Sequence, residues 1–256
     1  MRGFRVLLAK ELREQFRTGR MVAVAVVFVL FGILGPLTDR YMKELFDALG
    51  TQSGGMTFTV PAPSLEGNLG QILKNLSQFG VICALLLAMG SVAWEKERGT
   101  AGMIMTKPAS RGAFLAAKLA AISLNLGIAV ILGCGLGYLY TVLLYPSVFP
   151  LGGYVAMAAI MWWTLVVFTA ITMFGSTVTR SAIAAAGLAF VAFLMLGLLV
   201  TVPVIGPWSP LGLLTPAEHL ALGEDAGNFL GPLLFNIALV PALFGVTWLA
   251  FRRQEL

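Results

Sequence analysis

The side chains best suited to chemistry are few in this sequence of 256 residues. His219 follows Glu218, a pairing found in metal and protease sites, but it is the sole histidine and no H-E-x-x-H pattern surrounds it. Cys83 and Cys134 lie in apolar stretches, where cysteine acts as a small packing residue. The sequence has neither a G-x-x-x-x-G-K-[ST] phosphate-binding loop nor a G-x-S-x-G nucleophile motif. We therefore predict no catalytic residue, no metal site and no cofactor bound by this chain.

Two amide side chains, Asn125 and Asn236, lie inside long apolar stretches. A buried amide surrounded by lipid costs free energy unless it finds a hydrogen-bond partner. Each is therefore expected to face another helix, as an interhelical polar contact, or to line a transport path.

The elements that would position these residues are membrane-spanning helices. Hydrophobic residues make up 58% of the chain and charged residues only 11%, whereas a soluble domain has about 25% charged residues. A bilayer core needs about 20 apolar residues per helix. The sequence predicts an all-α integral membrane protein, a single domain over residues 1–256, with six spans. The predicted spans are residues 21–37, 78–93, 119–144, 154–178, 182–202 and 231–251.

Lysines and arginines divide unequally between the two sides of this arrangement. Fourteen of the 17 fall on the side of the termini, and only Arg40, Lys43 and Lys74 fall on the other. Cytoplasmic segments carry the excess of these residues, and six spans place both termini on one side. We predict a multi-pass protein of the cytoplasmic membrane with cytoplasmic termini. The net charge of +5 then reflects topology and not nucleic-acid binding.

The first 20 residues contain an apolar stripe. Phe4, Leu8, Leu12 and Phe16 recur every four residues among basic side chains, which predicts a helix with one apolar face. Such a helix lies in the membrane interface, with its cations near anionic lipid headgroups.

The segment after the second predicted span is longer than a connector needs. It begins with a charged cluster at residues 95–98, continues with Met103, Ile104 and Met105, and ends at a proline. Gly99 or Thr100 can cap a short helix there. Such a helix would lie across the membrane surface and present a face to a cytoplasmic partner.

Three motifs in this region closely resemble the permease subunits of type-2 ABC transporters. They are Glu-Lys-Glu-Arg-Gly-Thr at 95–100, Lys-Pro-x-Ser-Arg at 107–111 and Phe-Leu-x-x-Lys at 114–118. The resemblance implies that residues 1–20 are an elbow helix, that the segment 95–111 is a coupling helix, and that an outer re-entrant hairpin lies between spans five and six. It assigns docking of an ATPase subunit to Glu95, Glu97, Arg98, Gly99, Thr100, Met103, Ile104, Met105, Lys107, Pro108 and Arg111.

The resemblance further implies a transporter, predicted to be an exporter, whose ATP and Mg²⁺ are bound by a separate ATPase subunit. Six spans form half of such a transporter, so a second permease copy, identical or not, is expected as a partner. The alternative is a stand-alone secondary transporter or channel. That class generally needs charged residues inside its spans for ion coupling, and the six predicted spans contain none.

Overall fold

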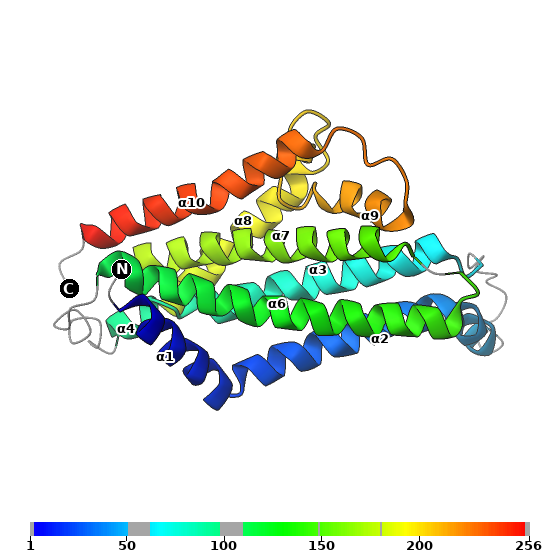
Figure 1. Cartoon of the computed structure of the whole chain (residues 1–256), viewed down its shortest axis with the longest axis horizontal. Helices are drawn as coiled ribbons and strands as arrows, with labels where there is room; N and C mark the ends of the chain where they lie inside the picture. The colour runs from blue at the N-terminus through cyan, green and yellow to red at the C-terminus, as the bar shows by residue number, and fades with distance from the viewer. Residues whose placement is uncertain (1–2, 51–61, 98–109, 148, 180, 254–256) are drawn as a thin grey trace.

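The computed structural model describes residues 3–50, 62–97, 110–147, 149–179 and 181–253, and these residues form helices without any strand. The helices begin and end as follows: α1 (Phe4–Arg17), α2 (Arg20–Gly50), α3 (Leu65–Met89), α4 (Ala93–Glu97), α6 (Arg111–Leu144), α7 (Leu151–Val178), α8 (Ala182–Leu199), the 3-10 helix η1 (Gly206–Trp208), α9 (Leu214–Leu222) and α10 (Leu230–Arg252). Figure 1 shows most of them running along one long axis.

Six helical stretches in the described residues are long and apolar enough to cross a membrane. They are Arg20–Met42, Leu65–Glu97, Arg111–Leu144, Leu151–Val178, Ala182–Leu199 and Leu230–Arg252. Large apolar side chains on their outer faces are exposed, such as Ile183 at 83% and Ile131 at 72%. Extensive exposed apolar surface marks a membrane-embedded protein. The prediction of an all-α protein with six candidate spans is confirmed.

Several helices extend beyond the predicted spans. The predicted spans stopped at charged residues, whereas the helices continue through these residues. α2 continues through Asp39, α3 begins thirteen residues before position 78, and α6 begins at Arg111, ahead of Lys118. The start of α3 is capped by Ser64, whose hydroxyl accepts a hydrogen bond from the Gly67 amide at 2.9 Å. Lys74 is exposed on the surface of α3, so its charge does not interrupt that helix.

The core of the bundle lies between α2, α3, α6 and α7. α2 approaches α6 so closely that a Cβ added to Gly32 would lie 2.2 Å from the carbonyl oxygen of Gly133. Only glycine permits this contact between helix backbones. Leu69, Leu126 and Leu165, from α3, α6 and α7, are fully buried in the same hydrophobic cluster.

The segment between α8 and α10 folds back against the bundle. In Figure 1, α8 ends and α10 begins part-way along the molecule, while α9 lies nearer to its right-hand end. The amide of Asn236 in α10 donates to the carbonyl of Trp208 in η1 at 3.1 Å. α9 packs against α7, where a Cβ on Gly153 would lie 1.8 Å from the carbonyl oxygen of Leu220.

The bundle has two distinct ends (Figure 1). We call one the α4 end: it contains α1, α4, the start of α6 and the end of α10. We call the other the α9 end: it contains the start of α3, the end of α6, the start of α7 and α9. At the α9 end the hydroxyl of Tyr145 donates to Asp39, which also accepts from the amide of Ser64 at 3.2 Å.

Candidate functional site

A buried lysine lies at the centre of the α4 end. The side chain of Lys118, in α6, is only 6% exposed. Its Nζ atom lies 3.1 Å from Oε1 of Glu11 in α1 and 2.8 Å from Oε1 of Glu95 in α4. An isolated buried charge is strongly unfavourable, whereas a cation with two carboxylates is compensated. Lys118 therefore joins α6 to α4 and to the distant N-terminal helix α1.

Lys10 extends this group toward solvent. Its Nζ atom lies 3.3 Å from Oε1 of Glu11 and 4.0 Å from Oε1 of Glu95, and its side chain is 48% exposed. Burial alone lowers the pKa of Lys10, but the nearby carboxylates of Glu11 and Glu95 together raise it above its ordinary value. Both lysines and both glutamates form one network, which we call the Lys118 network.

A second polar contact holds α1 to α6 next to this network. Nδ2 of Asn125 donates a hydrogen bond of 2.7 Å to Oε1 of Gln15, and both side chains are buried. Gln15 lies one helical turn after Glu11, so the two residues share a face of α1. The structure thus places Asn125 in an interhelical contact, one of its two predicted roles.

Backbone groups attach α4 to α7. The hydroxyl of Ser176 accepts hydrogen bonds from the amides of Val92 at 3.1 Å and Ala93 at 3.0 Å. Nζ of Lys96 donates to the carbonyl oxygen of Thr177. On the α2 side, the guanidinium of Arg20 lies 5.0 Å from the centre of the Trp94 ring. Movement of α4 is therefore resisted by contacts with α1, α2, α6 and α7.

The predicted docking residues are placed unevenly. Glu95 directs its carboxylate to Lys118, whereas Glu97 is exposed. Arg111 donates to the carbonyls of Phe251 at 3.2 Å and Arg252 at 3.0 Å, joining α6 to the end of α10. The predicted residues that lie outside the described part of the chain are Arg98, Gly99, Thr100, Met103, Ile104, Met105, Lys107 and Pro108.

Glu11 and Gln15 lie on the same side of α1 as the predicted apolar stripe. Phe4, Leu8 and Leu12 are half-buried and Phe16 is 66% exposed, whereas Glu11 and Gln15 are buried. The side of α1 that packs against the bundle is therefore partly polar, and Phe16 at its end is left exposed. Sequence reasoning found the helix but missed Glu11 and Gln15. Their four-residue spacing was the available signal.

Asn236 lies away from the α4 end. Nδ2 of this residue donates to the backbone carbonyls of Trp208 and Pro232, and the backbone carbonyl of Asn236 accepts from the Trp163 indole at 3.1 Å. It is fully buried and joins α10 to η1 and α7. Like Asn125, it is an interhelical contact. This contact is one of the two roles predicted for Asn236 from the sequence, the other being to line a transport path.

Comparison with known proteins identifies the family. The model of the "ABC-2 family transporter protein" family matches residues 5–216. The uncharacterized transmembrane protein YxlG of Bacillus subtilis is 27% identical over 258 residues, covering 100% of this chain and 99% of that protein. The probable ABC transporter permease protein NosY of Stutzerimonas stutzeri is 28% identical over 266 residues, covering 94% and 89%. The match spans most of the chain, so this protein belongs to the ABC-2 transporter family and is a permease subunit of that type.

Proposed function

We propose that this permease is the membrane half of an exporter and that a separate ATPase subunit docks at its α4 end. The family implies an ATPase partner, and the sequence contains no P-loop of its own. ATP and Mg²⁺ would bind to that partner. Residues 98–109, together with Glu97, would form the docking surface, with Met103 and Met105 as apolar anchors inside a charged rim.

The Lys118 network carries this proposal. Because Lys118 contacts both Glu95 and Glu11, a displacement of α4 would reach α1 and α6 together through charged contacts. The hydroxyl of Ser176 links the same helix to α7. Force applied to a docked α4 would thus reach several helices as one unit, which a driven transporter requires.

The proposal also includes the orientation of the protein in the membrane and its assembly with a second permease copy. The α4 end would face the cytoplasm, because the terminal arms and the segment around residues 95–111 hold most of the basic residues. A second permease copy would complete the path. The segment with η1 and α9 would be a re-entrant hairpin at the outer mouth, with α9 packed on α7 and η1 in contact with α10. Apolar spans favour a lipid-like, amphipathic or peptidic cargo over a small ion.

Co-purification with a candidate ATPase subunit tests the docking. Glu97→Lys should weaken assembly, and Met103→Ser with Met105→Ser should weaken it more, because buried anchors carry more binding energy than rim charges. Glu66→Lys is the matched control, since Glu66 is exposed at the α9 end. If the Glu97 and Met variants assembled and drove transport like the parent, the segment would be a mere connector and the proposal would be wrong.

Cysteine labelling tests the orientation separately. After Cys83 and Cys134 are replaced, a cysteine at Ser53 should react with an impermeant maleimide in intact cells. A cysteine at Ser110, the cap of α6, should react only after the membrane is opened. The reverse pattern would place the α4 end outside and exclude a cytoplasmic ATPase from it.

A further inference from the structure

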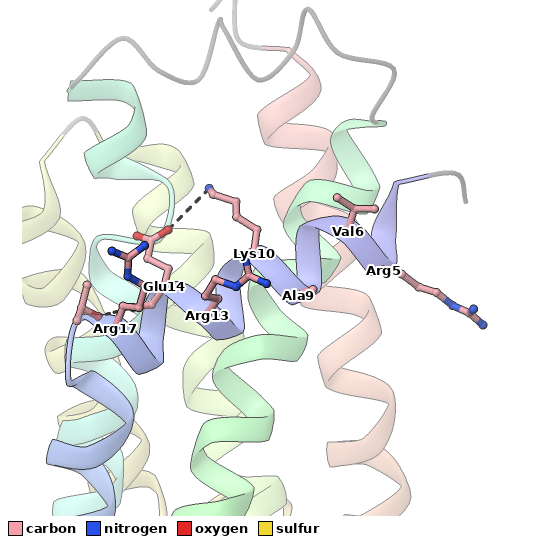
Figure 2. A pocket seen from close by; sticks show the side chains of 8 residues that line it. Arg5, Val6, Ala9, Lys10, Arg13, Glu14 and Arg17 are labelled. Carbon is pink, nitrogen blue, oxygen red and sulfur yellow. Dashed lines mark hydrogen bonds and ion pairs between the residues drawn. The ribbon is translucent and has the colours of Figure 1, made fainter.

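The outer face of α1 differs in chemistry from its inner face. Arg5, Ala9, Arg13 and Arg17 follow one another every four residues, so they form one stripe along the helix. All four are exposed, whereas Glu11 and Gln15 on the inner face are buried. Figure 2 shows the stripe on the side of α1 that points away from the other helices.

This stripe borders a cleft of about 710 Å³. The described residues that line the cleft are Arg5, Val6, Ala9, Lys10, Arg13, Glu14, Arg17 and Thr18. The small side chain of Ala9 leaves space between the guanidinium groups of Arg5 and Arg13. Glu14 is the one carboxylate in this lining, and it lies 3.8 Å from Nζ of Lys10. Among the described residues no carboxylate lies within ion-pair distance of Arg5, Arg13 or Arg17, so their positive charge is available to a ligand.

An apolar groove of about 320 Å³ lies beside the C-terminal end of α1. Its lining comes from α1, α2 and α6, and all of the described side chains in it are apolar. They are Phe16, Met21, Val22, Ala25, Val26, Val29, Leu30, Ile128 and Leu132. Because Phe16 lines the groove and Arg17 lines the cleft, consecutive residues connect the two. A cationic cleft therefore adjoins an apolar groove.

We propose that this surface binds an anionic phospholipid, with its phosphate at the arginines of α1 and an acyl chain in the groove between α2 and α6. Guanidinium groups hold phosphate oxygens through paired, charge-assisted hydrogen bonds. An interfacial helix places such groups at headgroup depth. The arginine stripe lies opposite to Glu11 on α1, while Lys10, which belongs to the Lys118 network, also lines the cleft. The proposal rests on the arginines and the apolar groove and does not depend on ATPase docking.

Titration of the purified chain in neutral detergent tests the site, with bound lipid counted by native mass spectrometry. Phosphatidylglycerol should bind the parent more tightly than phosphatidylcholine. Each arginine near an anionic headgroup contributes a factor of about five in affinity. Arg13→Gln with Arg17→Gln should therefore weaken phosphatidylglycerol binding by about 25-fold. Arg252→Gln with Arg253→Gln removes the same charge from exposed positions at the end of α10 and should leave binding unchanged.

Filling the groove tests the acyl part of the proposal. Ala25→Leu and, separately, Val26→Phe should each reduce phosphatidylglycerol binding several-fold while the protein stays folded, because Val26 is 50% exposed. Equal binding of both lipids by the parent, or equal loss in the two arginine pairs, overturns the proposal. Unchanged lipid binding by the two groove variants also overturns the proposal, because only the phosphate group, and no acyl chain, would then contact this surface. If the Arg13 and Arg17 variant kept the lipid but lost the ATPase, the stripe would instead dock an acidic protein surface.

Discussion

The two ends of the bundle are held together by different interactions. At the α4 end, charged side chains from α1, α4 and α6 meet around Lys118, and Arg111 joins α6 to α10. At the α9 end, α9 lies directly on the backbone of α7 at Gly153, Asp39 accepts two hydrogen bonds, and the one ion pair among the described residues there is the exposed His219–Glu224 contact at 2.8 Å. Charged contacts depend on each partner being present, whereas close packing depends on the absence of a side chain.

This difference agrees with the proposed roles of the two ends. A charge network fixes the relative positions of helices through long side chains, which can stay paired while the helices move together. A glycine contact has no such reach, because a shift of either backbone separates the atoms that touch. We infer that the α4 end transmits displacement and that the α9 end holds its parts at fixed separation.

The largest effect is expected for Lys118→Met. The substitution leaves the carboxylates of Glu11 and Glu95 facing each other without the buried cation, and loss of one member of a buried ion pair costs about 3–5 kcal/mol. Thermal unfolding of the purified protein in detergent, followed by tryptophan fluorescence, should show a clear fall in Tm.

Two further variants show whether the charge network is responsible. Lys74→Met removes an exposed lysine from α3 and should leave Tm close to that of the parent. Lys118→Met combined with Glu11→Gln and Glu95→Gln should recover most of the lost stability, because no unpaired charge remains. An unchanged Tm for Lys118→Met alone would mean that the two ends do not differ in the way described.

The membrane-spanning helices were predictable from the sequence, but the Lys118 network was not. The difference has a physical reason. A stretch of about 20 apolar residues crosses a bilayer whatever its neighbours are, so composition alone located six spans. The third predicted span began at residue 119, directly after Lys118, because the carboxylate partners of this lysine lie 107 residues away at Glu11 and in a different helix at Glu95. Such long-range pairing leaves no periodic signal in a single sequence.

The same cause affects Glu95 and Asp39. Glu95 was predicted to dock a partner because it belongs to a run of charged residues, yet its carboxylate lies against Lys118 inside the protein. The first predicted span ended at residue 37, just before Asp39, but α2 continues past this residue, and the Asp39 carboxylate accepts from Ser64 and Tyr145. Charge in a sequence shows that a partner or water is needed and does not show which.

An intermediate effect is expected at the α9 end for Gly153→Ala. The new Cβ would lie 1.8 Å from the carbonyl oxygen of Leu220, so α9 must shift away from α7, and overpacking of this kind costs about 1–3 kcal/mol. The same thermal unfolding assay measures it. A cysteine placed at the buried Ala221 should also become reactive to maleimide.

Gly152 offers the matched control. A Cβ at this neighbouring position meets no atom within 4 Å, so Gly152→Ala should be neutral or slightly stabilising, since alanine favours the helix. If the two alanine variants had equal Tm values, backbone contact would not be what holds α9 on α7. The proposed difference between the α4 end and the α9 end would then be wrong for the α9 end.

The smallest effect is expected for Tyr145→Phe, which removes the neutral donor to Asp39. Burial, followed by the hydrogen bond to this carboxylate, raises the pKa of the Tyr145 phenol above its ordinary value of 10.0. The phenol therefore stays protonated and keeps donating throughout the neutral range. Hydrogen bonds to charged groups contribute about 1.5–3 kcal/mol when fully buried. Because water reaches this half-buried pair, we expect about 1 kcal/mol.

The pH dependence of this loss separates the hydrogen bond from simple packing. A folded-state pKa above the unfolded value means that the stabilisation is fully present below pH 10.0 and is lost as the pH rises through the folded pKa. The Tm difference between parent and Tyr145→Phe should thus be constant from neutral pH to about pH 10 and shrink above it. Tyr140→Phe, also half-buried near the end of α6, should show neither the loss nor the pH dependence. A difference that persists unchanged in strong alkali would assign the effect to packing of the hydroxyl and not to its hydrogen bond with Asp39. Asp39 would then add no significant charged contact to the α9 end, where the His219–Glu224 pair is exposed, and the contrast with the α4 end would be sharper.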